Sequence, residues 1–157
     1  MMKILYVCTH NRCRSILCEA ITNSLGCGRL HAKSAGSQPS GEVHPLTLGY
    51  LAEAKIPVNG LASKSWNNLN GFEPDVVMTV CDSAAGESCP LWLGDSIKVH
   101  WGLEDPSRIE GADDQIAAAF ESTIAVITQR VNGLMGVAAL PKTEWLGALN
   151  HLTKTQA

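Results

Sequence analysis

Two kinds of hydrophobic pattern alternate along this chain. Short runs of apolar and β-branched residues are typical of strands, and longer segments with apolar residues three or four positions apart are typical of helices. We expect strands at residues 3–7, 31–36, 75–80 and 96–101. We expect helices at residues 15–25, 45–55 and 112–134, the last of these ending near Gly133 and Gly136, and a short final helix at 141–152.

The order of these elements predicts the fold class. Strands and helices alternate from the N-terminus, and alternation of this kind produces a parallel sheet that is covered on both faces. We therefore predict an α/β fold, a three-layer sandwich in which helices lie on both faces of a four-stranded parallel sheet. Because 157 residues are enough for one core without splitting in two, we expect a single domain over residues 1–157.

Composition and charge narrow the possible functions. A net charge of -3 and an aromatic content of 5% do not indicate nucleic-acid binding. No long apolar stretch and no signal-like N-terminus is present, so we expect no membrane association and a cytoplasmic location. The chain contains six cysteines but has too many core residues to need a disulfide scaffold. Some of these thiols are therefore expected to have a chemical role.

A short loop of sequence Cys-Thr-His-Asn-Arg-Cys-Arg-Ser, residues 8–15, joins the first expected strand to the first expected helix. The backbone N–H groups of such a loop point inward, and the positive end of the helix dipole lies beneath them. The loop therefore predicts a binding site for a tetrahedral oxyanion. The residues expected to contribute to substrate binding are Thr9, His10, Asn11, Arg12, Cys13, Arg14 and Ser15.

The two ends of this loop indicate nucleophilic chemistry. A helix start beside an arginine favours the thiolate form of Cys8, which is the reactive form. The planar guanidinium of Arg14 can hold two oxyanion oxygens at once and complements charge that develops in the transition state. Ser15 can donate to the Cys8 sulfur. The alternative is a buried strand-end cysteine beside a solvated arginine, which this spacing between a strand and a helix disfavours.

A second pair of cysteines, Cys81 and Cys89, follows directly on the third expected strand. Loops at the carboxyl ends of the strands share one face of a doubly wound sheet, so this segment is expected near Cys8. The stretch between the two cysteines is small and polar with a glycine, a composition that can change shape and bring thiols together. The alternatives are a reduced pair in a surface loop and a metal site with His100, for which the cysteine spacing is wrong.

Several of these features together resemble a known family. Cys8, Asn11, Cys13, Arg14 and Ser15 resemble the active-site loop of the low-molecular-weight tyrosine phosphatases and of the arsenate reductases built on the same fold, and the loop alone does not separate the two activities. The resemblance extends to about residue 135. Its other motifs are Ser34-Ala-Gly36, Val80-Cys-Asp82, Cys89-Pro90, and His100-Trp-Gly102 before Asp105-Pro106.

Within this family, the resemblance favours the arsenate reductases, because a reductase that delivers two electrons needs further thiols. It implies that arsenate is held by the loop amides and Arg14 and is attacked by Cys8, while Asp105 protonates the departing oxygen. Cys81 then attacks the Cys8 sulfur, and Cys89 resolves the disulfide that forms. Thioredoxin, or glutaredoxin with glutathione, is expected to recharge the enzyme, and no cofactor or metal is expected.

The sequence leaves some roles open. Glu104 competes with Asp105 for the role of the acid. Cys13 either packs beneath the loop or pairs with Cys8 under oxidation, whereas Cys18 and Cys27 are expected to be structural and packed.

Two other functions remain as alternatives. A tyrosine or small-molecule phosphatase would use Cys8, Arg14 and Asp105 unchanged, but Ser107-Arg108 stands where phosphatase relatives have paired tyrosines. The second alternative is a non-enzymatic redox or oxyanion sensor that uses its thiols to switch binding to a partner.

One departure from the family concerns a bound ion. Some relatives hold potassium through positions that match Asn11, Glu19 and Ser34 together with an aspartate, and Lys64 stands where that aspartate would be. We hypothesise that the ammonium of Lys64 takes the place of the ion, pairs with Glu19 and leaves the enzyme insensitive to potassium. The alternative is that Lys64 is a solvated surface lysine.

Overall fold

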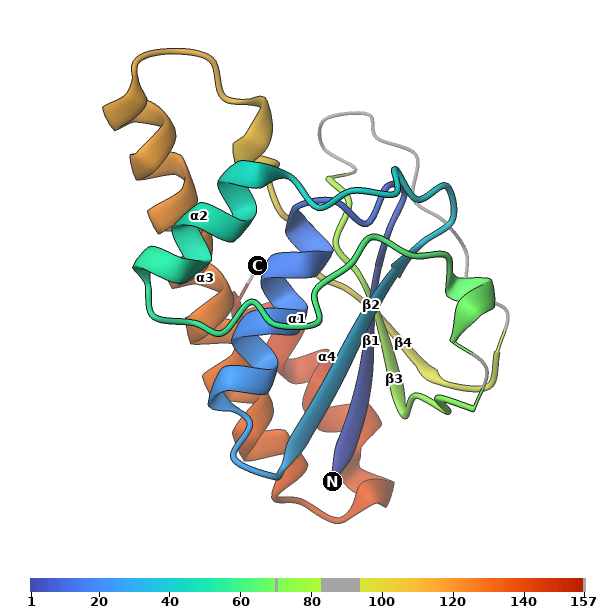
Figure 1. Ribbon diagram of the computed structural model, residues 1–157. Coiled ribbons are helices and arrows are strands. Elements are labelled where there is room, and N and C mark those ends of the chain that lie inside the picture. The colour runs from blue at the N-terminus through green and yellow to red at the C-terminus, as the bar shows by residue number, and fades with distance from the viewer. Residues whose placement is uncertain (70, 83–93, 157) are drawn as a thin grey trace.

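A four-stranded parallel sheet forms the centre of the molecule, with strand order β2-β1-β3-β4 (Figure 1). The computed structural model describes residues 1–69, 71–82 and 94–156. The inner strand β1 is buried along almost its whole length, as its apolar sequence requires. The strands are β1 (Met2–Cys8), β2 (Leu30–Gly36), β3 (Val76–Thr79) and β4 (Ile97–His100).

Among the described residues, four α-helices connect and flank the strands. They are α1 (Arg14–Leu25), α2 (Pro45–Glu53), α3 (Asp113–Ala138) and α4 (Trp145–Gln156). The same part of the chain contains the short 3-10 turns η1 (Trp66–Asn68), η3 (Pro106–Arg108) and η4 (Lys142–Glu144). At the start of α3, Gln115 Oε1 accepts a hydrogen bond from the Ala112 N–H at 2.9 Å, which satisfies a donor at the helix start.

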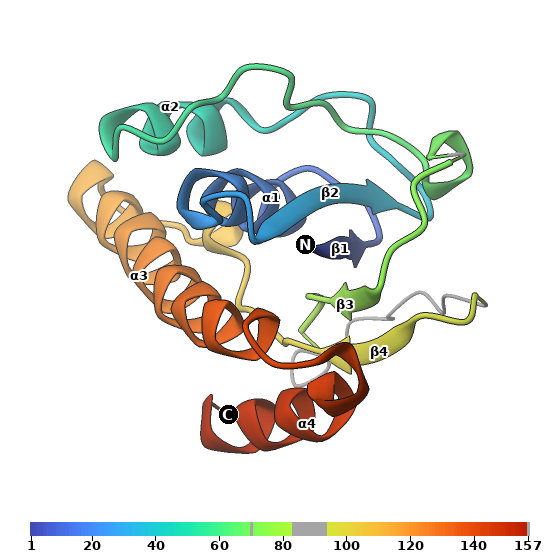
Figure 2. The same cartoon turned by 90° about the horizontal axis from the view of Figure 1, so that it is seen from below.

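The two faces of the sheet are covered differently. Alternate side chains of β1, including Ile4 and Tyr6, enter a large core to which all four α-helices contribute. The opposite face carries a small cluster of Leu5, Val7, Ala35 and Val77, against which Trp66, Leu69 and Phe72 pack. Figure 2 shows the α-helices on one side of the sheet and η1 on the other.

The α/β class and the four-stranded parallel sheet are confirmed. In the described part of the chain, however, helical cover on the second face is the single turn η1. The predicted end of the long helix is wrong, because α3 continues through Gly133 and Gly136 to Ala138. Buried Leu134 and Val137 hold this last turn against the core, and their packing outweighs the low helix propensity of glycine.

Parallel strands place the expected functional loops at one edge of the sheet. Cys8 ends β1, Cys81 follows β3 by two residues and Asp105 follows β4 by five. All three strands run in the same direction, so these residues are gathered at the carboxyl edge, at the upper end of the sheet in Figure 1. Among the described residues, no helix is both long and apolar enough to cross a membrane.

Candidate active site

The loop at residues 8–15 turns tightly against the end of β2. Gly36 lies opposite Cys8, and a Cβ at Gly36 would come within 2.5 Å of the Thr9 carbonyl oxygen. Only glycine allows this approach. Asn11 adopts the left-handed conformation with φ 48°, which asparagine tolerates better than most residues, so the chain can reverse into α1.

The Cys8 sulfur lies at the bottom of this loop and is hydrogen-bonded there. The Ser15 Oγ is 3.0 Å from the Cys8 Sγ, and the Asn11 backbone N–H donates to the same sulfur at 3.1 Å. Both contacts can stabilise a thiolate, because each places a donor against the charged sulfur. The first turn of α1 contains no acidic residue that would occupy the anion site at its positive end.

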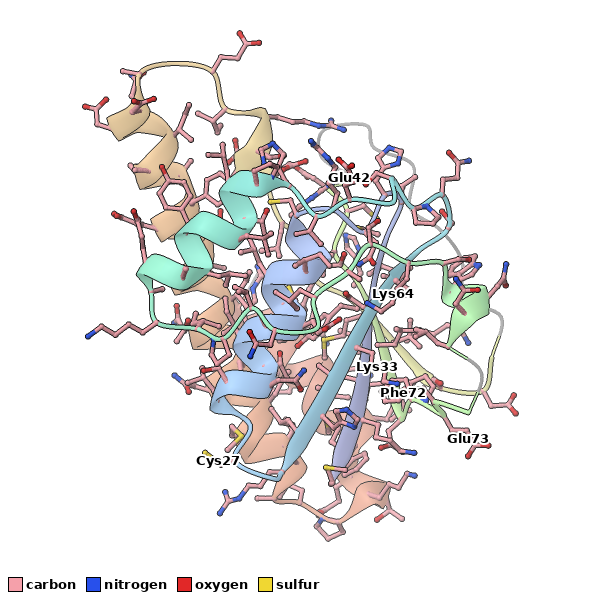
Figure 3. The ribbon with its side chains drawn as sticks, in the orientation of Figure 1. Cys27, Lys33, Glu42, Lys64, Phe72 and Glu73 are labelled. Atoms are coloured by element: carbon pink, nitrogen blue, oxygen red, sulfur yellow. The ribbon has the colours of Figure 1, made fainter. Side chains whose placement is uncertain are left out.

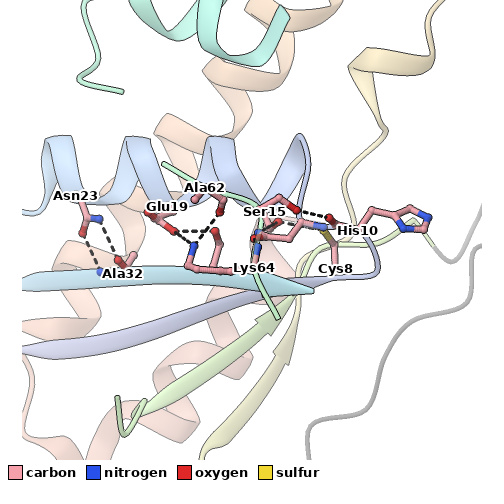
Figure 4. Close-up of polar contacts among 11 residues, drawn as sticks. Cys8, His10, Ser15, Glu19, Asn23, Ala32, Ala62 and Lys64 are labelled. Carbon is pink, nitrogen blue, oxygen red and sulfur yellow. Dashed lines mark hydrogen bonds and ion pairs between the residues drawn. The ribbon is translucent and has the colours of Figure 1, made fainter. Parts of the chain in front are cut away.

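The side chain of Asn11 braces the loop instead of pointing into it. It is fully buried, donates to the Ser15 Oγ at 2.8 Å and accepts from the Lys64 backbone N–H at 2.9 Å. The Lys64 carbonyl in turn accepts from the Gly36 N–H at 2.9 Å. Figure 4 shows this line of polar contacts from α1 to Cys8. Asn11 therefore positions the Ser15 hydroxyl for its hydrogen bond with the Cys8 sulfur.

Arg14 is the first residue of α1 and is 95% buried at the site. One terminal nitrogen, Nη1, donates to the Leu103 carbonyl at 3.1 Å, and the other, Nη2, lies 3.8 Å from the Asp105 Oδ2. These contacts hold the guanidinium between the oxyanion loop and the segment after β4. The structure therefore brings Cys8, Arg14 and Asp105 to one site, as the sequence predicts.

Asp105 is held through both carboxylate oxygens. The backbone N–H and the hydroxyl of Ser107 donate to its Oδ1 at 3.0 and 2.6 Å. Its Oδ2 faces Arg14 and also lies 3.5 Å from the Nε of Arg108. Asp105 lines the pocket, whereas Glu104 is exposed and does not, which favours Asp105 as the acid.

The segment that carries Asp105 is anchored to the core. Trp101 and Leu103 are buried, and the Leu103 N–H donates to the Val80 carbonyl at 3.3 Å. Arg130 of α3 lies over the Trp101 ring at 5.6 Å and donates to the Gly102 carbonyl at 3.3 Å. These contacts hold the backbone segment that carries Asp105 in place.

These groups surround a small pocket of about 120 Å³, lined by Cys8, His10, Arg12, Cys13, Arg14, Asp105, Ser107 and Arg108. This volume suits a tetrahedral oxyanion. Of the predicted binding residues, Thr9, Asn11 and Ser15 do not line the pocket, and Asn11 and Ser15 are hydrogen-bonded to each other. His10 is exposed, and its ring Nδ1–H donates to the Gln38 carbonyl at 3.0 Å.

The predicted pairing of Lys64 with Glu19 is confirmed. The Lys64 Nζ lies 3.4 Å from the Glu19 Oε1, and the Ser34 hydroxyl donates to the same oxygen at 2.7 Å (Figure 4). The Lys64 side chain is 24% exposed, so it is not the solvated surface lysine of the alternative interpretation. Its ammonium supplies positive charge between α1 and β2, beside the Glu19 carboxylate.

The cysteines that the structure describes differ from one another in state and position. Cys81 is fully buried and disulfide-bonded, while Cys8, Cys13, Cys18 and Cys27 are free. The predicted role of Cys89 falls outside the described residues.

Cys13 and Cys18 are buried, whereas Cys27 is exposed. Burial raises the pKa of Cys13 to about 12 and also raises that of Cys18, so both favour the neutral thiol and fit a packing role. The packed position expected for Cys27 is wrong. This residue lies in the turn after α1 with φ 48° and is exposed, at the end of the molecule away from the active-site loop (Figure 3).

Two contacts of the site could not be found by reading the sequence. The Leu103 carbonyl that accepts from Arg14 is a backbone group, so no residue type indicates it. Arg108 lies in the segment after Asp-Pro, but only the 3-10 turn η3 brings its guanidinium back to the Asp105 carboxylate. A spacing of three residues from the acid is the only signal in the sequence for this contact.

Comparisons with known proteins agree with this geometry. Residues 3–145 match the family model of the low molecular weight phosphotyrosine protein phosphatases. The chain is 31% identical to a glutaredoxin arsenate reductase of Synechocystis sp. over 86% of this chain and 97% of the relative.

Solved structures give a similar result. An arsenate reductase in its phosphate-binding state superposes with a TM-score of 0.70 at 29% identity, covering 88% of this chain and all of the other. A thioredoxin-dependent arsenate reductase of Corynebacterium glutamicum gives a TM-score of 0.64 at 26% identity, covering 88% of this chain and 62% of the other.

Proposed function

The chain belongs to the low molecular weight phosphotyrosine protein phosphatase family, and we propose that within this family it is an arsenate reductase, an oxidoreductase that converts arsenate to arsenite. One observation carries the proposal beyond the family. Strand pairing of Val7 with Thr79 places Cys81 one residue past the position opposite the nucleophile Cys8, on strands about 4.8 Å apart. A second thiol at this position suits a reductase, whereas phosphoryl transfer needs only one thiol, that of Cys8.

The first step uses the pocket as it stands. Arsenate binds at the N-terminus of α1, with its oxygens against the loop amides and the Arg14 guanidinium. The Cys8 thiolate attacks arsenic and forms a sulfur–arsenic bond. The bond from arsenic to its hydroxyl group breaks, and Asp105 in its protonated form delivers one proton to the departing hydroxyl, which leaves as water. The product is a covalent thiol–arsenate in which arsenic is still As(V).

The next steps move two electrons onto arsenic. The Cys81 thiolate attacks the Cys8 sulfur, the sulfur–arsenic bond breaks, and its electron pair stays on arsenic, which leaves as arsenite. The two sulfurs are oxidised to a disulfide between Cys8 and Cys81. The Cys89 thiolate then attacks Cys81, releasing Cys8 as a thiolate and leaving a disulfide between Cys81 and Cys89. A disulfide-bonded Cys81 beside a free Cys8 is the combination that this sequence of steps predicts at its end.

An external dithiol must then reduce the enzyme. The relatives include a glutaredoxin arsenate reductase and a thioredoxin-dependent one, so both reductants are chemically reasonable for this chain. We propose thioredoxin, or glutaredoxin with glutathione, as the partner that attacks the final disulfide.

A phosphatase is the second candidate function, because the pocket contains every group that phosphoryl transfer needs. Cys8 can accept a phosphoryl group, Arg14 can hold its oxygens and Asp105 can protonate the leaving alcohol. Phosphate and arsenate also have the same shape. We therefore expect residual phosphatase turnover even in a dedicated reductase.

The test is arsenate-dependent oxidation of NADPH in the presence of thioredoxin and its reductase, repeated with glutaredoxin and glutathione. The wild type is compared with Cys81→Ser and Cys89→Ser, and hydrolysis of p-nitrophenyl phosphate is measured in parallel. The proposal predicts at least a ~100-fold loss of arsenate turnover in both variants, with phosphatase activity retained within about twofold. Absence of arsenate turnover in the wild type with both reductant systems would make this protein a phosphatase.

A further inference from the structure

Most residues that line the described part of the pocket are polar or ionic. Beyond the thiols of Cys8 and Cys13, the lining consists of three arginines, a histidine, an aspartate and a serine, and this described lining contains no phenyl or indole ring. An organic phosphate ester would place its carbon substituent, beyond the ester oxygen, against these groups. An inorganic oxyanion has no such substituent, and its outermost oxygen carries a charge or a hydroxyl group.

Arg108 lies where it can contact the group that differs between the two kinds of anion. Attack by Cys8 requires the leaving oxygen to lie on the opposite side of the central atom, toward Asp105. The Arg108 Nε lies 3.5 Å from the Asp105 Oδ2, so its guanidinium is next to the path of the leaving oxygen. The turn η3, which follows Asp105 directly, lies beside the N-terminal end of α1 in Figures 1 and 2.

The contact between Arg108 and Asp105 leaves Arg108 able to move. Its side chain is 66% exposed, and ion pairs of this kind contribute little to stability because water competes for both partners. Asp105 keeps its two hydrogen bonds from Ser107 and its contact with Arg14 if Arg108 moves away. The guanidinium can therefore turn from the carboxylate to a bound anion without releasing the acid.

We propose that Arg108 is a specificity-determining residue that selects unsubstituted inorganic oxyanions over organic esters. Its guanidinium contacts the outer oxygen of the bound anion, which carries negative charge or a hydroxyl group in arsenate and phosphate. In an ester, this oxygen is bonded to carbon, so it carries neither the charge nor the hydroxyl group, and the organic substituent beyond it strips water from the guanidinium without offering it an acceptor. The inference rests on the proposed function for its physiological substrate, but it concerns binding alone.

The test measures binding without turnover. The fully reduced protein is alkylated with iodoacetamide, labelling of Cys8 is followed by peptide mass spectrometry, and the concentration of anion that halves the rate is recorded. Inorganic phosphate has an outer oxygen, and phenylphosphonate has a phenyl carbon there. The variants are Arg108→Ala and Arg108→Lys, with Arg29→Ala as a control that removes the same charge at the other end of β2, where Arg29 is exposed.

We expect Arg108→Ala to raise the half-protecting concentration of phosphate by about five- to tenfold and that of phenylphosphonate by less than about twofold. Arg108→Lys should fall between the wild type and Arg108→Ala, and Arg29→Ala should change neither value. An equal change for both anions, or no change for phosphate, would overturn the proposal. If the wild type reduces no arsenate but shows the expected protection pattern, the proposed function fails while the role of Arg108 stands.

Discussion

Two thiols of one loop differ because their surroundings differ. Cys8 receives hydrogen bonds from the Asn11 N–H and Ser15, whereas burial raises the pKa of Cys13 to about 12. The Cys13 thiol therefore stays protonated across the neutral pH range, since its titration lies far above it. This assigns the reactivity of the loop to Cys8 and gives Cys13 a packing role.

The difference predicts selective labelling. At pH 7, iodoacetamide should modify Cys8 at least ~100-fold faster than Cys13, because only the thiolate reacts. Peptide mass spectrometry of samples quenched over time gives both rates. In Cys8→Ser, Cys13 should remain unlabelled over the same period. Similar labelling rates for the two residues would contradict this assignment.

We expect Lys64 to make the enzyme insensitive to potassium. Its ammonium already pairs with Glu19, so replacing sodium by potassium at equal ionic strength should change turnover by less than about 20%. In Lys64→Ala, Glu19 loses its cation, and we expect lower turnover that potassium partly restores. Steady-state rates in the two salts check both statements. Clear activation of the wild type by potassium would contradict the hypothesis.

At the scale of elements, the start of α2 is coupled to the oxyanion loop. The ring Nδ1 of His44 caps this helix by accepting a hydrogen bond from the Leu46 backbone N–H at 3.1 Å. The backbone N–H of His44 donates to the Arg12 carbonyl at 3.0 Å. Burial lowers the pKa of His44 below its usual 6.5 and the Arg12 charge lowers it further, although Asp105 acts in the opposite direction.

The cap makes part of the stability depend on pH. With the folded pKa below the unfolded value, the unfolded chain binds more protons between the two values, so stability is full above pH 6.5 and falls as the pH drops. Protonated Nδ1 also cannot accept from Leu46. His44→Asn keeps a side-chain acceptor that does not titrate. Between pH 7.5 and 5.5, we expect the melting temperature of the wild type to fall by about 1–2 °C more than that of His44→Asn. An equal fall in melting temperature for the two proteins would show that His44 does not contribute to the pH dependence of stability.

At the scale of the whole molecule, the C-terminal helix belongs to the core. Trp145 and Leu149 of α4 are buried with side chains of β1 and α3, and the Trp145 Nε1–H donates to the Leu140 carbonyl at 3.0 Å. α4 starts at the last residue of the match to the family model and packs near β4.

The packing of α4 predicts a large effect from one residue. Trp145→Ala should lower the free energy of unfolding by about 3 kcal/mol, because it leaves a cavity in the core. The neighbouring Leu146 is 54% exposed, so Leu146→Ala should cost about 0.5 kcal/mol or less. Urea unfolding of both variants measures the difference. A loss of similar size in the two variants would mean that α4 does not share the core.

The sequence was sufficient for the sheet and for the central groups of the site. Apolar runs such as residues 3–7 predicted the strands because buried parallel strands are apolar on both faces, and the loop spacing predicted Cys8 and Arg14. The end of α3 was missed because packing of Leu134 and Val137 overrides the glycines. The contact of Arg108 with Asp105 was missed because it depends on a turn that no local pattern specifies.

We propose that Cys8, Cys81 and Cys89 together reduce arsenate. The most direct measurement mixes fully reduced protein with excess arsenate in the absence of any external reductant, and then counts arsenite and lost thiols and maps the disulfide by mass spectrometry. We expect one arsenite and two lost thiols per protein molecule, with the disulfide between Cys81 and Cys89. Absence of arsenite with all thiols retained would contradict the proposal.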